Sequence, residues 1–415
     1  MDLEHNNVRA TLNEDRLSGL PHELIHQILS PFDTIFVVQT CLLLSPRWKL
    51  IWTSMPYLNF SSNGFRTIDK FSNFVTHVLS HHNHQVQVSS VYLKVYGATS
   101  QDFVRKIANY VISHNVQELI LDIRPNLSHE KPTFRSKTHT FDRCLTPKTP
   151  WDFPALTTLY LDHISLCDDR RESIDLFSKC VNLKNLTLNS VRVEAKVLEI
   201  ITPRLATLRL VNYDCYNAIN VIAPQLENLT IINCLMKEFN IPSELSSFYY
   251  KGYHTPQWIK KCFNSVNKVT VSLSICCPNL PSMQEHACSI IDMLQELHSA
   301  RFLTLNLDIV ECISSFPELV SAHSSPFRNL IRLNIDSGSR DTCKVKMSTE
   351  ARNFLLENSP NATFIMKELP MKSMKDKEVK ERKKAKLVSD IEDLIKELQK
   401  YFKSKLWIKR NHKHH

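Results

Sequence analysis

LTTLYL (residues 156–161), LKNLTL (183–188), LATLRL (205–210) and LENLTI (226–231) repeat one arrangement of apolar residues along the middle of the chain. In each segment leucine or isoleucine occupies the first, fourth and sixth positions, and most residues between them are polar. Successive segments begin 27, 22 and 21 residues apart. A period of this kind indicates a repeat structure, in which each unit buries its apolar residues only against its neighbours.

The spacing and residue types fit the leucine-rich repeat, in which a short strand is followed by a helix. Alternate residues of a strand point to opposite faces of the sheet. We therefore expect the leucines to lie inside, and the residues between them to line the concave face of a parallel sheet. This predicts an α/β fold.

Looser copies of the pattern extend the array in both directions. They lie at residues 91–93, 119–121, 248–250, 269–271, 303–307 and 330–335. Helices are expected between strands, for example at residues 170–180, 195–201 and 283–297, with a capping helix and last strand at 351–369. The sequence thus predicts a solenoid over residues 85–371, with a loop or degenerate repeat at residues 124–152.

Aromatic and charged residues between the leucines are candidates for binding a protein partner, because tyrosine and arginine are enriched in interface hot spots. The candidates are Tyr160, Asp162, Arg209, Tyr249, Lys251, Asn306 and Asp308. The alternative is that each of these side chains is merely solvated.

A second organised stretch, residues 15–60, precedes the repeats. Its apolar residues form three short segments with helical spacing. Pro31 ends the first predicted helix, Asp33 can cap the second, and Ser45 followed by Pro46 can open the third. A module of about 45 residues is small for an independent core, so we expect it to need a partner.

This stretch resembles an F-box of the plant type that precedes leucine-rich repeats. The resemblance rests on Leu20-Pro21, Ile28-Leu29, Asp33-Thr34, Ser45, Trp48, Leu50-Ile51-Trp52 and the closing Pro56, Leu58 and Phe60. Residues 351–369, which contain Asn-Ser-Pro, are similar to a late segment of the FBD-type F-box proteins. Pro31 and Pro46 depart from the family pattern.

The resemblance implies a small three-helix F-box that binds a SKP-type adaptor and, through it, a cullin. The residues implied at the adaptor interface are Leu20, Pro21, Ile25, Ile28, Leu29, Val38, Leu44 and Trp48. The repeats would then hold an unknown substrate protein. The chain would act as the non-catalytic receptor subunit of an SCF-type ubiquitin ligase in the nucleus or cytoplasm.

Composition narrows the function classes. The five glycines form neither GxGxxG nor GxxxxGK, so no phosphate loop is expected. No apolar run approaches the 18 residues of a membrane span, no secretory signal is recognisable, and no cofactor is expected. The twelve cysteines lack a CxxC pair and are interpreted as buried thiols. His81, His82 and His84 are interpreted as part of a solvated loop rather than a metal site.

The C-terminal tail dominates the charge. Residues 372–415 hold 15 Lys and Arg against 7 Asp and Glu, a net of +8, whereas the whole chain is +9. Leu387, Ile391, Leu394 and Leu398 alternate at spacings of four and three residues, which predicts an amphipathic helix. Three interpretations stay open: a helix packed on the last repeat, a nuclear-localisation or nucleic-acid-attracting segment, and a partner-helix or dimer seam.

The predicted organisation is a disordered segment at residues 1–14, an F-box at 15–60, a helical connector at 61–84, the repeats at 85–371 and a basic helical tail at 372–415. Two alternatives to the ligase receptor remain. One is a nucleic-acid or chromatin-associated scaffold acting through the tail, and the other is a scaffold unrelated to ubiquitin.

Overall fold

The computed structural model describes residues 20–43, 48–97, 99–124, 144–145, 150–166, 172–213, 218–241, 244–256, 265–275, 280–337 and 347–367. Two compact units divide this part of the chain, one ending at Lys94 and the other starting at Val95. The predicted basic tail, the disordered N-terminus and most of the loop at 124–152 lie outside the described residues.

Three short helices open the first unit: α1 (His22–Leu29), α2 (Thr34–Leu43) and η1 (Trp48–Ser54). The first helix ends just before Pro31, as predicted, because proline lacks the N–H that would continue the helix. The third segment is a 3-10 helix rather than the expected α-helix. Trp48 and Ile51, three residues apart, are both buried, which suits three residues per turn.

The next elements of this unit are β1 (Tyr57–Ser61), α3 (Ile68–His81) and β2 (Ser90–Tyr96). The two strands pair in parallel, with Leu58 opposite Val91 and Phe60 opposite Leu93. Thr34, buried at the start of α2, accepts a 2.8 Å hydrogen bond from the amide of Asn59. The buried residues after η1 therefore form a strand that is tied to α2.

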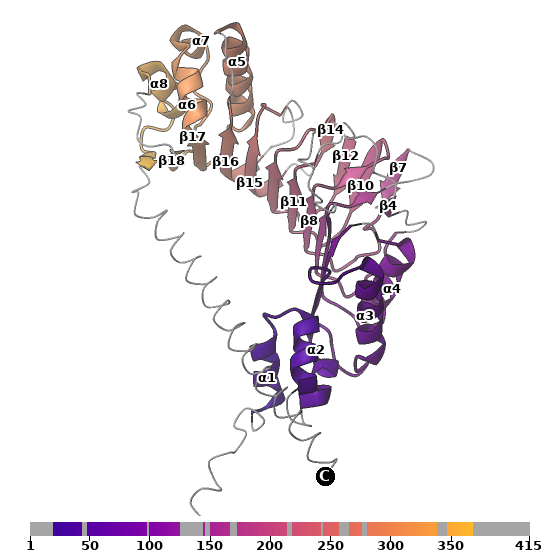
Figure 1. Ribbon diagram of the computed structural model, residues 1–415. Helices are drawn as coiled ribbons and strands as arrows, with labels where there is room; N and C mark the ends of the chain where they lie inside the picture. Colours follow the sequence, from indigo (N-terminus) through magenta and orange to yellow (C-terminus); the bar gives the residue numbers. More distant parts are fainter. Residues whose placement is uncertain are drawn as a thin grey trace, which may run out of the picture. The chain divides into compact units, whose positions relative to one another are not determined.

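The second unit is built on a parallel sheet with the strand order β3-β5-β8-β11-β13-β15-β16-β17-β18-β19 (Figure 1). Its strands are β3 (Glu118–Arg124), β5 (Thr158–Asp162), β8 (Asn185–Asn189), β11 (Thr207–Val211), β13 (Asn228–Ile232), β15 (Glu244–Gly252), β16 (Ser265–Leu273), β17 (Phe302–Asn306), β18 (Arg332–Asp336) and β19 (Thr363–Lys367). The strands predicted from the leucine pattern are confirmed.

Burial alternates along these strands. In β11, Leu208 and Leu210 are fully buried, whereas the alternate residues Thr207, Arg209 and Val211 keep exposed surface. The register places Leu208 between Leu186 and Leu229, so like residues stack from strand to strand. We call the surface made by the alternate, partly exposed residues the open face.

Residues with positive φ follow the strands of the central repeats. His163, Ser190, Asn212 and Asn233 each come directly after a strand and have φ values of 56°, 50°, 49° and 50°. The amide of each donates to a carbonyl of the next strand, for example from Asn212 to Ile232 at 2.8 Å. This left-handed residue continues the strand ladder and then turns the chain away from the sheet.

Short strands, rather than helices, form the return path of the central repeats. The segments at 170–180 and 195–201, predicted as helices, contain β7 (Ser173–Asp175) and β10 (Val197–Ile201). With β12 (Ala218–Ile222) and β14 (Glu238–Asn240) they make a second parallel sheet. Val197–Ile201 alternates in burial like a strand, with Leu198 and Ile200 buried.

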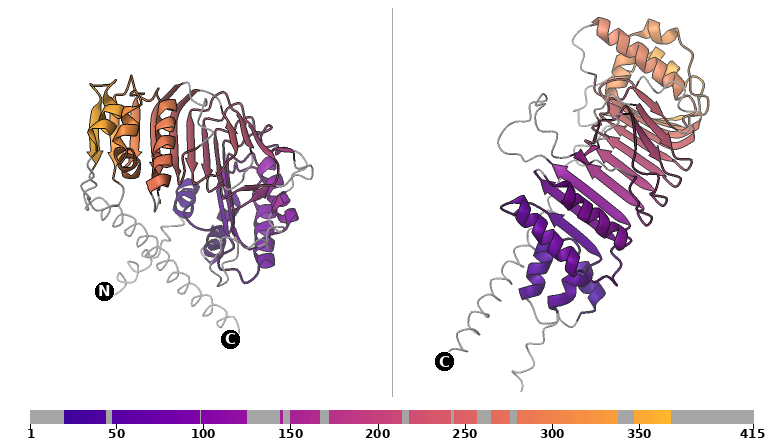
Figure 2. Two further views of the ribbon diagram at one scale, coloured as in Figure 1. Left: turned by 90° about the horizontal axis from the view of Figure 1, so that it is seen from above. Right: turned by 90° about the vertical axis from the view of Figure 1, so that its right-hand side faces the viewer.

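Longer repeats toward the C-terminal side do carry helices. These are α5 (Leu280–Glu296), α6 (Leu307–Ser314), α7 (Pro317–Ser321) and α8 (Thr349–Leu356), while α4 (Gln101–Ser113) precedes β3. Figure 1 shows α5 to α8 gathered together, next to strands β16 to β18. Of these helices the sequence predicted α5 and the capping helix α8. Short strands β4 (Cys144–Leu145), β6 (Ser165–Leu166) and β9 (Arg192–Val193) complete the second unit, whose side-by-side strands are visible in Figure 2.

Candidate functional site

The open face has two polar regions, one along the ends of strands β3 to β13 and the other over strands β15 to β18. The first is a hydrogen-bonded series that we call the polar ladder, made of Asp122, Arg124, Tyr160, Asp162, His163, Asn189, Asn212 and Asn233. The second is a groove over strands β15 to β18. Arg209, whose side chain is exposed on β11, lies on one of the strands that the ladder crosses.

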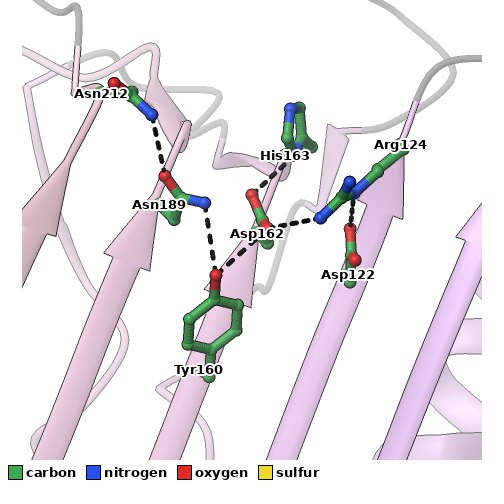
Figure 3. Close-up of polar contacts among 7 residues, drawn as sticks. All are labelled: Asp122, Arg124, Tyr160, Asp162, His163, Asn189 and Asn212. Atoms are coloured by element: carbon green, nitrogen blue, oxygen red, sulfur yellow. Dashed lines mark hydrogen bonds and ion pairs between the residues drawn. The ribbon is translucent and has the colours of Figure 1, made fainter. Parts of the chain in front are cut away.

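The polar ladder joins the carboxyl ends of neighbouring strands (Figure 3). Tyr160 donates from its hydroxyl to Asp162 Oδ2 at 3.2 Å and accepts from Asn189 Nδ2 at 3.3 Å. Asn212 Nδ2 then donates to Asn189 Oδ1 at 3.2 Å, and Asn233 to Asn212 at 3.5 Å. The three contacts made by asparagine amides each link one repeat to the next.

Asp162 is the charged centre of the ladder. Its side chain is only 1% exposed, and its Oδ1 lies 2.6 Å from Nδ1 of His163. Burial alone would raise the pKa of Asp162, but the contacts from His163, Asn189 and Tyr160 stabilise the carboxylate and lower the pKa overall. Burial likewise raises the pKa of the Tyr160 phenol.

Arg124 contacts two carboxylates at the same edge. Its Nε donates to Asp122 Oδ1 at 2.8 Å, and its Nη2 lies 3.5 Å from Asp162 Oδ2. The bond to Asp122 raises the pKa of the guanidinium. Asp122, Asp162 and His163 are the described residues whose ligand atoms come close enough to hold one metal ion. Arg124 already supplies the positive charge there, so the cluster fits an internal ion-pair network.

The prediction that Asp162 offers an accessible carboxylate is therefore wrong. The residue follows Leu161 directly, and the neighbouring ion pairs and hydrogen bonds enclose it. Arg124, whose side chain is 41% exposed, is the charged group of the ladder that faces solvent. Arg124 and Asp122 were not predicted as site residues. Their position at the end of a predicted strand, beside the end of the next one, was the available signal.

The groove lies where the returns change from strands to helices. It has a volume of about 370 Å³. Its lining includes three of the predicted substrate residues, Tyr249, Lys251 and Asp308, together with Asp336, which was not among the substrate candidates. The structure thus brings together candidates that are nearly 60 residues apart in sequence.

Asn306, the fourth predicted residue at the groove, serves the fold. Its Oδ1 accepts from the amide of Leu273 at 3.0 Å, and its Nδ2 donates to the carbonyl of the same residue at 2.7 Å. Both ends of the amide group are used inside the sheet. Asn306 therefore holds β17 to β16 at the point where α6 begins, instead of offering its amide to a partner.

Apolar side chains are exposed on the helices of the first unit. Leu24 and Ile28 of α1 are 45% and 49% exposed, Leu42 of α2 is 56% exposed, and Leu50 of η1 is 71% exposed. Ile25 of the same α1 helix is fully buried. The helix thus has two apolar stripes, of which one forms the core of the unit and the other faces solvent.

The predicted adaptor residues divide in the same way. Pro21 and Ile28 are exposed, Leu20 and Val38 are partly exposed, and Leu44 lies outside the described residues. Ile25, Leu29 and Trp48 are at most 4% exposed, so these three residues form the core of the unit. Leu24, Leu42 and Leu50 were not predicted at the interface, because helical spacing alone does not distinguish an exposed apolar stripe from a buried one.

Buried thiols were predicted, and Cys41, Cys180, Cys234 and Cys312 are buried, whereas Cys288 is exposed. Burial raises the pKa of Cys41 to about 12 and that of Cys180 and Cys234 to about 11. These thiols stay protonated at neutral pH. His82, predicted in a solvated loop, is buried and its Nε2 lies 2.9 Å from the carbonyl oxygen of Met55.

No family model matches the chain. Curated proteins of Arabidopsis thaliana do. An F-box/FBD/LRR-repeat protein is 32% identical over 188 residues, which are 43% of this chain and 40% of that protein. A putative FBD-associated F-box protein is 28% identical over 56% of this chain and 46% of its own length. Another is 27% identical over 374 residues, 87% of this chain and 74% of that protein.

The chain is related to plant F-box/FBD/LRR-repeat proteins. The predicted resemblance to plant F-box proteins with leucine-rich repeats is thereby confirmed, because these relatives carry F-box, FBD or LRR-repeat names. In the first two of these relatives, the matched region spans less than half of the protein. Among the described helices, none is both long and apolar enough to cross a membrane.

Proposed function

We propose that this chain is a receptor subunit of an SCF-type ubiquitin ligase. In this proposal the first unit acts as an F-box that docks on a SKP-type adaptor, and through it on a cullin. The open face of the second unit holds the protein to be modified. The observation that carries the proposal is the solvent-facing apolar stripe on α1, in a chain related to F-box/LRR proteins.

The stripe is unusual for the surface of a small helical unit. Leu24 and Ile28 are one helical turn apart, so their side chains lie on the same side of α1. Leu42 and Leu50 add exposed apolar surface on two further elements, α2 and η1, which pack against each other. Exposed apolar surface of this kind marks protein interaction sites.

The buried residues of the predicted adaptor set have a supporting role. Ile25 and Leu29 point into the core, which fixes the rotation of α1 and so the direction of the exposed stripe. Trp48 does the same for η1. Adaptor contact is therefore assigned to Pro21, Leu24, Ile28, Leu42 and Leu50, with Leu20 and Val38 at the margin.

The activity proposed for the chain is one of positioning. A receptor that binds both the adaptor and a target raises the effective concentration of the target's lysines near the enzyme that carries ubiquitin. This role needs rigid surfaces and no reacting group of its own. The hydrogen-bonded strands of the parallel sheet supply this rigidity. The buried thiols are protonated, which fits a chain without a reacting group.

Adaptor binding tests the proposal. The full chain is used to capture a purified SKP-type adaptor, and the double variant Leu24→Asp with Ile28→Asp is compared with Leu235→Asp. Leu235 is 41% exposed in the second unit, so its variant carries a similar change away from α1. We expect the double variant to lose capture and the control to retain it, with unchanged circular dichroism in both.

Two results would contradict the proposal. One is no capture of the adaptor by the unaltered chain, and the other is equal capture by the double variant. The scaffold role suggested by the basic tail rests on residues 372–415, which lie outside the described part, and it remains a prediction.

A further inference from the structure

We infer that the groove over β15 to β18 binds an extended peptide segment with one acidic and one basic side chain about four residues apart. This inference deepens the proposed function, because it gives the class of target segment that the open face would hold. It rests on the order of side chains across the strands, on the hydroxyl groups between the charges, and on the shape of the groove wall.

The charges lie at opposite sides of the groove. Lys251 is on β15 and its side chain is exposed, whereas Asp336 ends β18 and Asp308 lies in the first turn of α6, directly after β17. The register pairs Lys251 with Ser272 of β16, and Asn306 of β17 with Asp336 of β18. One side of the groove therefore attracts a carboxylate, and the other attracts a cation.

Hydroxyl-bearing residues fill the floor between these charges. Tyr249, Thr270 and Thr304 are consecutive partners across β15, β16 and β17, and Ser272 lies beside Thr270 on the open face. Each hydroxyl can both donate and accept a hydrogen bond. Such a floor matches the N–H and C=O groups of a peptide backbone better than it matches an apolar side chain.

Asn306 gives the groove its wall. The pairing of β17 with β16 ends at Leu305, and α6 begins at Leu307. The side-chain amide of Asn306, between them, makes two hydrogen bonds to Leu273. The start of α6 is thereby held against the sheet, and its first turn stands beside the floor with Asp308 at the edge of the groove.

The width of the groove sets the spacing of charges in the ligand. Neighbouring strands are about 4.8 Å apart, so three steps from β15 to β18 cover roughly 14 Å. An extended peptide rises about 3.3 Å per residue, so residues i and i+4 are about 13 Å apart. In an extended peptide these residues also point to the same side. An acidic residue and a basic residue at this spacing can meet Lys251 and Asp336 together.

Synthetic peptides test this inference on the full chain. Three nine-residue peptides of serine and threonine carry aspartate and lysine, two lysines, or two aspartates at positions 3 and 7. Binding is measured by fluorescence anisotropy at low and high salt. We expect the mixed peptide to bind best, and we expect binding to weaken as salt screens the charges.

Reversing one charge of the groove should change the preference. Lys251→Glu should weaken binding of the mixed peptide about fivefold, the size expected for an exposed ion pair, and should make the dilysine peptide the preferred ligand. Lys268→Glu is the matched control, since Lys268 is an exposed lysine of β16 that does not line the groove. This control should keep the preference of the unaltered chain.

The inference is overturned if the three peptides bind equally, if none of them binds, or if Lys251→Glu and Lys268→Glu behave alike. Capture of the SKP-type adaptor is measured on the same samples. Adaptor capture without peptide selectivity refutes the groove assignment alone, whereas peptide selectivity without adaptor capture refutes the ligase role alone.

Discussion

Arg124 and Asp162 are about 40 residues apart in the chain, yet Nη2 of the arginine lies 3.5 Å from Oδ2 of the aspartate. The arginine ends β3 and the aspartate ends β5, which are paired in the sheet. Their contact therefore depends on the parallel stacking of two repeats. The same aspartate holds His163 and Tyr160, so a single carboxylate organises the polar side chains at this edge of the second unit.

Replacing Asp162 with asparagine should destabilise the protein. The variant keeps the size of the side chain but removes the negative charge that pairs with Arg124 and His163. Because Arg124 is 41% exposed and can be hydrated, we expect a loss of about 1 to 3 kcal/mol in the free energy of unfolding. Urea unfolding followed by circular dichroism measures it. Asp102→Asn, at a side chain that is 80% exposed, should change stability by less than about 0.5 kcal/mol.

Stability should also depend on pH through Asp162. The folded protein lowers the pKa of this carboxyl, so the unfolded chain takes up its proton first as the pH falls. The stabilisation is complete above the unfolded pKa of about 3.9 and is lost as the pH falls through the lower folded value. The difference in unfolding free energy between the unaltered protein and Asp162→Asn should shrink below about pH 4. A constant difference would refute this assignment.

A separate prediction concerns Asn212, which directly follows β11 and has a left-handed backbone conformation. Asn212 has a φ of 49°, which costs a β-branched residue more than it costs asparagine or glycine. Asn212→Val should therefore destabilise the protein by at least about 1 kcal/mol, and Asn212→Gly should cost less despite losing the contact with Asn189. Thermal unfolding compares the two variants with Thr230→Val, a mid-strand change to the same side chain. Equal effects of valine and glycine would show that the backbone conformation is not the cause.

The two stripes of α1 should differ in stability. Ile25 is fully buried, so Ile25→Ala should cost about 2 to 5 kcal/mol through lost burial and the cavity left behind. Ile28, which is 49% exposed, should cost less than about 1 kcal/mol when replaced by alanine. Chemical unfolding of the full chain checks both values. Similar losses at the two positions would place Ile28 in the core and weaken its assignment to the adaptor interface.

Thiol reactivity should follow burial. Cys288 is exposed, whereas the pKa of Cys41 is raised to about 12 and that of Cys180 to about 11. Because the thiolate is the reactive form, iodoacetamide at pH 8 should modify Cys288 well before the other two. Peptide mass spectrometry reads each cysteine separately, and labelling in urea should remove the difference. Early modification of Cys41 in the folded protein would contradict the burial described for α2.

The sequence predicted the strands of the sheet well, because each leucine triplet records both the strand and its buried face. It did not predict the return paths. Val197–Ile201 has a composition compatible with a helix or a strand, and in the structure its burial alternates as in a strand. Site residues were predicted where side chains alternate, as for Tyr249 and Lys251. Arg124 was missed because its contact arises between repeats. Asn306 was a candidate, but its structural role at a strand end that turns directly into a helix was not predicted.

The change from strand-backed to helix-backed repeats, marked by Asn306, has a consequence for divergence among related chains. The groove forms at this junction, so its place along the sheet depends on how many short repeats come before it. Gain or loss of one short repeat would move the groove by one strand spacing, about 4.8 Å, without altering its lining. The number of short repeats thus sets the distance between β3 and a bound target, independently of the residues that recognise that target.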